Sequence, residues 1–163
     1  MKTLHVLLAS SDRAAMNRIE ALVHDVCFER ALVECTRTAR VDDFEKLGSC
    51  GWLDLIVFSP DSLLSASQRN SRNIMREAIR SVREIRKRTL IPFIAFGVSE
   101  DDKTQVYEAG VEIVLGRLLE SDQLRAELTG VLNLPAPLQK VAPTRWGALG
   151  RFFPGLATAK AKA

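Results

Sequence analysis

Ser59 follows residues 53 to 58, which are apolar at every position except Asp54 and have the length and composition of a buried strand. A serine at the exit of such a strand would act as a nucleophile only with a nearby general base and an acid that orients this base. The two histidines, His5 and His24, fall in a predicted strand and a predicted helix, and neither pattern directs a base at Ser59. We therefore expect that the chain is not an enzyme.

Five apolar runs of strand length alternate with segments of helical periodicity and would position Ser59 and its neighbours. The first helix is predicted from Ser11 or Asp12, and the fourth starts within residues 99 to 102 and ends at Gly110. Strands that alternate with helices predict an α/β fold of (βα)5 order, with a doubly wound, parallel, five-stranded sheet. The predicted strands are residues 4–9, 31–35, 53–58, 91–96 and 111–115.

Two junctions in this pattern resemble a known family. The stretch Asp54-Leu-Ile-Val-Phe-Ser59 is similar to the segment that leads to the phosphoacceptor of response-regulator receiver domains, and Ile91-Pro-Phe-Ile-Ala-Phe96 is similar to their fourth strand. Together with the (βα)5 order, these junctions make residues 3 to 132 resemble a CheY-like, flavodoxin-like receiver. The resemblance implies a site with two acids after the first strand and an aspartate after the third, which bind Mg²⁺ through oxygen ligands. It also implies a hydroxyl after the fourth strand and a lysine after the fifth.

The chain departs from the family at all five of these positions. Without carboxylates there is no dense negative charge to bind Mg²⁺, and a neutral serine cannot form an acyl phosphate. We expect a degenerate pseudo-receiver with no cofactor and no metal, in which the Ser59 hydroxyl bonds to backbone or to one of the other two serines. The residues at the degenerate positions are Ser10 and Ser11 for the acid pair, Ser59 for the nucleophile, Gly97 for the hydroxyl and Arg117 for the lysine.

The predicted third helix carries a single basic stripe with helical spacing. Its members are Arg76, Arg80, Arg83 and Lys87, flanked by Arg69, Arg72, Arg86 and Arg88. A solvated helix face is one interpretation of this pattern, and a surface for an acidic protein partner, an anionic lipid or nucleic acid is the other. No nucleic-acid recognition motif accompanies the stripe, so nucleic acid is the less favoured partner.

Residues 133–163 differ in composition from the predicted domain, residues 1–132. They are rich in proline and alanine and contain five basic residues and no acidic ones. Either an aromatic cluster in this tail folds back onto the domain, or it forms a docking motif for a partner groove or for peripheral contact with a membrane surface. The residues of this motif are Trp146, Leu149, Phe152 and Phe153.

The composition of the 163 residues, 47% hydrophobic and 26% charged, fits one domain with a tail. No run is long enough for a membrane helix, and the N-terminus lacks the pattern of a signal peptide. Three cysteines at spacings that match no zinc or redox motif are typical of reduced thiols in the cytoplasm.

These observations predict an adaptor in signalling or localisation that works by protein contacts and without phosphorylation. A homodimer through the face of helix four, strand five and helix five, about residues 100–128, is the pairing that the resemblance implies. The alternative is a regulator that binds nucleic acid with the basic third helix and the basic tail.

Overall fold

A computed structural model describes residues 1–65 and 73–133 of the chain. The aromatic motif of the tail lies outside these residues, as do two arginines that flank the basic stripe, Arg69 and Arg72. The predictions about the tail and its boundary at residue 132 therefore stay predictions.

The described residues form one parallel sheet of five strands, as the alternation of strands and helices predicted. Its spatial order is β2-β1-β3-β4-β5. The strand order therefore reverses between β1 and β3, as in other doubly wound sheets. The strands are β1 (Lys2–Ala9), β2 (Ala31–Thr38), β3 (Leu55–Phe58), β4 (Phe93–Ala95) and β5 (Ile113–Val114).

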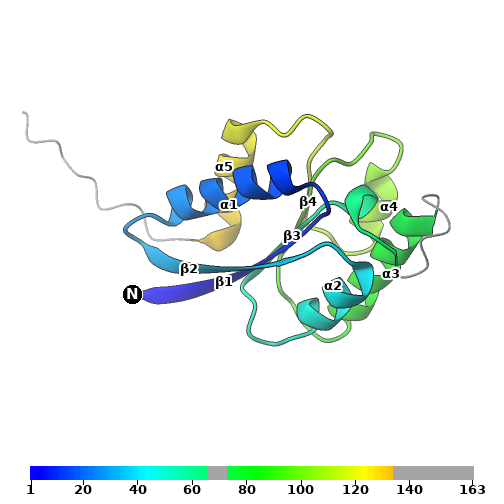
Figure 1. Cartoon of the computed structure of the whole chain (residues 1–163), viewed down its shortest axis with the longest axis horizontal. Coiled ribbons are helices and arrows are strands. Elements are labelled where there is room, and N and C mark those ends of the chain that lie inside the picture. Colours follow the sequence, from blue (N-terminus) through cyan, green and yellow to red (C-terminus); the bar gives the residue numbers. More distant parts are fainter. Residues whose placement is uncertain (66–72, 134–163) are drawn as a thin grey trace, which may run out of the picture.

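Helices cover both faces of this sheet (Figure 1). One face packs against α1 (Arg13–Cys27) and α5 (Ser121–Leu132), and the other against α2 (Val41–Gly48), α3 (Ile74–Arg86) and α4 (Lys103–Glu108). None of the helices within the described part of the chain is long and apolar enough to span a bilayer. The prediction of a doubly wound (βα)5 fold is confirmed.

The central strands explain why both layers are needed. All four side chains of β3 are buried, and Ile56 and Phe58 belong to the cluster under α2 and α3, whereas Leu55 and Val57 belong to the cluster under α1 and α5. Alternate side chains of a strand point to opposite faces, so an apolar run without alternation demands cover on both sides. The apolar run of residues 55 to 58 therefore requires the three-layer architecture.

Several boundaries differ from the predicted ones. β2 continues to Thr38 because it stays in register with β1 up to the pair Ala9 and Thr38. In contrast, β3, β4 and β5 are shorter than the strands predicted for them. In the segment predicted to start the fourth helix, the Ser99 hydroxyl donates to the Asp102 carboxylate in a turn, and the helix itself begins at Lys103. Gly110 follows this helix with a φ of 108°, as expected for a residue just beyond a helix end.

Candidate functional site

The carboxyl ends of β1 and β3 lie side by side and bring Ser10 and Ser59 to the same edge of the sheet. The backbone continues the hydrogen-bonded ladder there, since Ser10 donates its N–H to Thr38 at 2.9 Å and Ser59 donates its own to Ala9 at 3.0 Å. Both residues are buried, with exposed fractions of 0% and 5%. Two neutral hydroxyls thus occupy positions where the receiver pattern has carboxylates.

Ser62 is the hydroxyl partner of Ser10, and sequence reasoning did not single it out. Their Oγ atoms are 2.6 Å apart, and the Asp12 N–H donates to Ser10 Oγ at 3.0 Å. Ser11 is exposed, but its N–H donates to the Ser62 carbonyl at 2.9 Å. The expected side-chain bond of Ser59 to Ser10 or Ser11 is absent from the described residues, because the short helix Pro60–Ser62 brings Ser62 back over the end of β1.

Ser59 and Gly97 face one hollow of about 500 Å³ above the sheet edge, together with Arg117 and Asp12. Gly97 has a φ of 71°, and a Cβ atom at this residue would lie 3.2 Å from Ser59 Oγ. A side chain at position 97 would therefore be strained and would crowd the serine. The positive φ therefore favours glycine here, and a hydroxyl-bearing side chain would require Ser59 Oγ to shift by a few tenths of an ångström.

Asp61, two residues after Ser59, is a carboxylate that sequence reasoning did not assign to this edge. Burial, and then the charge of Asp102, raises the pKa of Asp61, while the Arg117 guanidinium lowers it. Asp102 in turn accepts hydrogen bonds from Ser99 and, at 2.8 Å, from the Gln105 side chain. The edge thus has acidic residues, but they lie around the expected position of the nucleophile and not at it.

The residues at this edge do not fit the Mg²⁺ that the receiver pattern implies. Asp12 is used as the N-cap of α1, where its carboxylate accepts from the Ala15 N–H at 3.0 Å. Within residues 1–65 and 73–133, the carboxylates of Asp12, Asp61 and Asp102 do not come close enough to form a three-ligand group. A hard divalent cation binds through anionic oxygens, and the positions that would supply them carry neutral hydroxyls.

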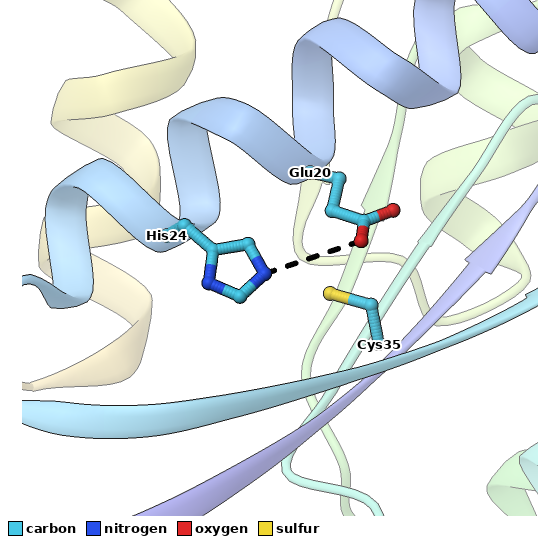
Figure 2. Close-up of side chains that lie close together, drawn as sticks. All are labelled: Glu20, His24 and Cys35. Carbon is cyan, nitrogen blue, oxygen red and sulfur yellow. Dashed lines mark ion pairs between the residues drawn. The ribbon is translucent and has the colours of Figure 1, made fainter.

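A different group of side chains lies between α1 and β2, away from this edge. Glu20 and His24, one turn apart on α1, point toward Cys35 of β2 (Figure 2). Burial, and then the Glu20 carboxylate, raises the pKa of the Cys35 thiol to about 11. The spacing of Glu20 and His24 was visible in the sequence, but the third member comes from another element.

The basic stripe of α3 is exposed, as a binding surface requires. Arg76, Arg80, Arg83 and Lys87 all face solvent, and Lys87 pairs with Glu84 at 2.7 Å. In the part of the chain that the structure describes, no acidic side chain forms an ion pair with Arg76, Arg80 or Arg83. Three arginine charges are therefore available to a partner on this face.

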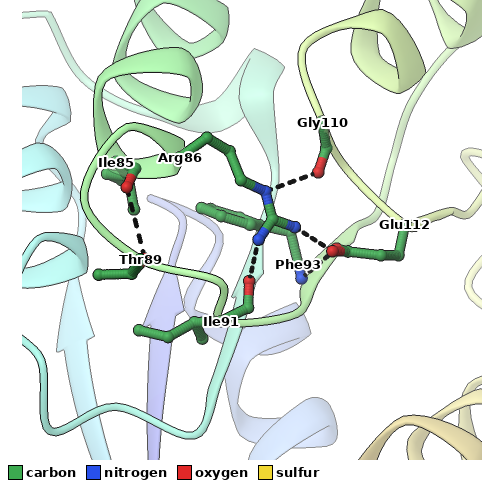
Figure 3. Close-up of polar contacts among 7 residues, drawn as sticks. All are labelled: Ile85, Arg86, Thr89, Ile91, Phe93, Gly110 and Glu112. Carbon is green, nitrogen blue, oxygen red and sulfur yellow. Dashed lines mark hydrogen bonds and ion pairs between the residues drawn. The ribbon is translucent and has the colours of Figure 1, made fainter.

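Arg86, predicted to flank this stripe, is instead a structural residue. Its guanidinium donates to the carbonyls of Gly110 at 2.9 Å and Ile91 at 2.6 Å, pairs with Glu112 and lies 4.7 Å from the centre of the Phe93 ring (Figure 3). Glu112 also accepts from the Phe93 N–H at 2.7 Å. The prediction that Arg86 belongs to the basic surface is wrong, because its side chain turns inward and is only 16% exposed.

Solved structures of receiver domains resemble this fold closely in arrangement and weakly in sequence. The receiver domain of a sensor histidine kinase from Pseudomonas aeruginosa has a TM-score of 0.62 at 16% identity, with 80% of this chain and 98% of that chain covered. A CheY-like receiver domain protein from Methanospirillum hungatei has a TM-score of 0.61 at 15% identity, over 81% and 95% of the two chains. At these identities the similarity establishes the fold alone.

A third similar structure is that of a protein assigned to pilus assembly, cpaE, from Burkholderia thailandensis. Its TM-score is 0.57 at 18% identity, with 80% of this chain and 98% of that chain covered. No protein-family model matches the sequence, and no curated protein matches it. The CheY-like fold is thus established by structure, and the serines at its carboxyl edge stand where the receiver pattern has carboxylates.

We predict that Asp61→Asn raises the thermal midpoint slightly at pH 7. The raised pKa of Asp61 means that the folded state disfavours its ionised form, so the penalty is present above this pKa and disappears as the pH falls through it. The variant should therefore lose its advantage in acid, as measured by thermal unfolding at several pH values.

The companion variant Arg117→Gln removes the charge that lowers the pKa of Asp61. It should move the Asp61 carboxyl titration, followed by NMR, to higher pH. A titration midpoint that stays in place would contradict the electrostatic contact between these two residues.

We predict that Arg86→Ala lowers the free energy of unfolding by about 2 to 4 kcal/mol, because two backbone carbonyls and Glu112 lose a charged partner. The matched control is Arg83→Ala on the exposed face of the same helix, which should change it by about 0.5 kcal/mol or less. Urea unfolding of both variants tests this, and equal losses would contradict the structural role of Arg86.

Proposed function

We propose that this chain is a receiver-like adaptor that works by protein contacts, without phosphorylation, in signalling or in localisation. The observation that carries the proposal is Ser59, a serine at the end of β3 where the receiver pattern needs its phosphoacceptor aspartate. A serine hydroxyl cannot form an acyl phosphate, and it contributes no charge to a Mg²⁺ site.

The surroundings of Ser59 support the same conclusion. The Ser10 hydroxyl is bonded to Ser62, and the positive φ of Gly97 disfavours a hydroxyl-bearing side chain, whose Cβ would also crowd Ser59 Oγ. Restoring an aspartate at position 59 alone would therefore not rebuild a phosphorylation site. In this proposal the chain is not an enzyme, and its function lies on the outer surfaces of the domain.

The names of two similar structures agree with an assembly or localisation role. Both the Burkholderia thailandensis protein and a further one from Burkholderia pseudomallei, at 18% identity and a TM-score of 0.56, are assigned to pilus assembly. By analogy of fold, we extend to this chain a role in organising other proteins in the cytoplasm.

Three surfaces are the proposed contacts with a partner. The first is the exposed stripe of Arg76, Arg80 and Arg83, which suits an acidic protein. The second is the face formed by α4, β5 and α5, about residues 100–128, where Tyr107 and Leu118 are 49% and 84% exposed; pairing through it would give a homodimer. The third is the aromatic motif of the tail, for a protein groove or for peripheral membrane contact.

Nucleic-acid binding is the second candidate, supported by the same three arginines. Acidic residues interrupt the basic face, since Glu84 pairs with Lys87 and Glu77 lies nearer the start of the helix. Repeated phosphates bind best to a continuous surface of positive charge. The interrupted basic face therefore favours a protein partner over nucleic acid. A mobility shift that weakens steeply with salt would support nucleic-acid binding instead.

We predict that incubation with acetyl phosphate and Mg²⁺ leaves the mass of the intact protein unchanged, because no carboxylate is placed to accept the phosphoryl group. A conventional receiver domain treated in parallel serves as the positive control. An adduct of one phosphoryl group that is labile to hydroxylamine would overturn the proposal.

We also predict that charge reversal of the stripe, with Arg76, Arg80 and Arg83 each replaced by Glu, strongly reduces the recovery of partners in affinity capture from the source organism. The control variant replaces three exposed basic residues elsewhere by Glu, and its recovery of partners should be unchanged. These residues are Arg13, Arg40 and Lys46.

A second arm of the same experiment replaces Trp146 and Phe152 by alanine in the full chain. Loss of the same partners would show that the tail contributes to the contact. Unchanged recovery of partners in both the stripe and the tail variants would contradict a role of these two surfaces in binding. The face of α4, β5 and α5 would then be the remaining candidate.

A further inference from the structure

Three side chains with metal-binding chemistry meet where α1 crosses the edge strand β2. One ligand atom from each of Glu20, His24 and Cys35 lies within 4.8 Å of the other two, and His24 Nε2 is 4.0 Å from Glu20 Oε1. Figure 2 shows the thiol rising from the strand toward the two side chains of the helix. We propose that these residues bind a borderline-soft divalent cation, such as Zn²⁺, with water in the fourth position.

The distances are near those of a tetrahedral site. Bonds of about 2.0 to 2.3 Å from the metal place ligand atoms about 3.3 to 3.8 Å apart, so the three atoms need to approach one another by only about 1 Å. Rotation about the side-chain bonds of Glu20 and His24 can supply this movement, while Cys35 is fixed by the strand. The site is also accessible, since the side chains of His24 and Glu20 are 52% and 28% exposed.

The mixture of sulfur, nitrogen and oxygen selects the type of ion. Thiolate and imidazole favour Zn²⁺ and its neighbours over Mg²⁺ and Ca²⁺, which take oxygen ligands. On binding, the Cys35 thiol releases its proton to solvent, and the resulting thiolate and the Glu20 carboxylate are the two anionic ligands of the ion.

A neighbouring arginine orients the carboxylate. Arg37 donates from Nε to Glu20 Oε2 at 2.7 Å and from its amino group to Asn17 at 2.8 Å, whereas Glu20 Oε1 is the oxygen nearer to His24. One oxygen is thus held by the protein and the other is directed toward the proposed ion. Partners of this kind, which fix the first ligands, are typical of metal sites.

Within residues 1–65 and 73–133, no other three side chains of these types come together in such a group. The sequence contains only two histidines and three cysteines, and residues 66–72 and 134–163 include none of them and no acidic residue. Of the other thiols, Cys27 is buried and Cys50 is half-buried against the Lys46 carbonyl. The site is also separate from the edge at Ser59, so the inference does not depend on the proposed function.

The test uses the full-length, reduced and metal-free protein, titrated with Co²⁺ as a spectroscopic probe. We expect one Co²⁺ per chain, a thiolate-to-cobalt band in the near ultraviolet and visible bands of a four-coordinate ion, all of which disappear when Zn²⁺ is added. Cys35→Ser should abolish the thiolate band, and His24→Gln should weaken Co²⁺ binding by about tenfold or more. The matched controls Cys50→Ser and His5→Gln should leave both signals unchanged.

Circular dichroism of each variant separates loss of a ligand from loss of the fold, and Cys35→Ala provides a second thiol-free variant. The inference is overturned if saturating Co²⁺ produces no thiolate band in the wild-type protein. It is also overturned if folded Cys35→Ser protein binds Co²⁺ as tightly as wild type, or if Cys50→Ser removes the band.

Discussion

Burial of β3 on both faces is the constraint on which this structure depends. Its four side chains divide between two apolar clusters, one under α1 and α5 and the other under α2 and α3. A parallel strand buried on both sides requires helical crossovers, which return the chain to the same end of the sheet each time. All five carboxyl ends therefore meet at one edge, whatever residues stand there.

This separation of scaffold from edge explains why the fold tolerates hydroxyls at the edge, where the receiver pattern has carboxylates. Apolar burial below the edge supplies the stability, and the edge itself needs only that its buried polar groups find partners. Ser10 finds Ser62, and the backbone of Ser59 bonds to Ala9. A pair of hydroxyls meets this need at lower desolvation cost than a group of buried carboxylates without a cation.

The helix α3 shows how the same residue type serves two purposes on one element. Arg83 is solvated, whereas Arg86, three residues later, binds carbonyls of two loops and the ring of Phe93. The two arginines project from different sides of the helix, and only Arg86 faces the segments that lead into β4 and β5. The basic residues of α3 thus provide both surface charge and attachment of the helix to the sheet. Their spacing in the sequence indicated the surface charge but not the attachment.

The sequence by itself determined the alternation of strands and helices, the two-sided burial of residues 55 to 58 and the residue types at the carboxyl edge, since these depend on local periodicity and chain order. Tertiary structure alone decided that Ser62 pairs with Ser10, that Arg86 turns inward and that Cys35 meets Glu20 and His24. Such contacts join elements far apart in the chain. They depend on the register of β2 against β1 and on how α1 packs across them, which spacing within one element cannot specify.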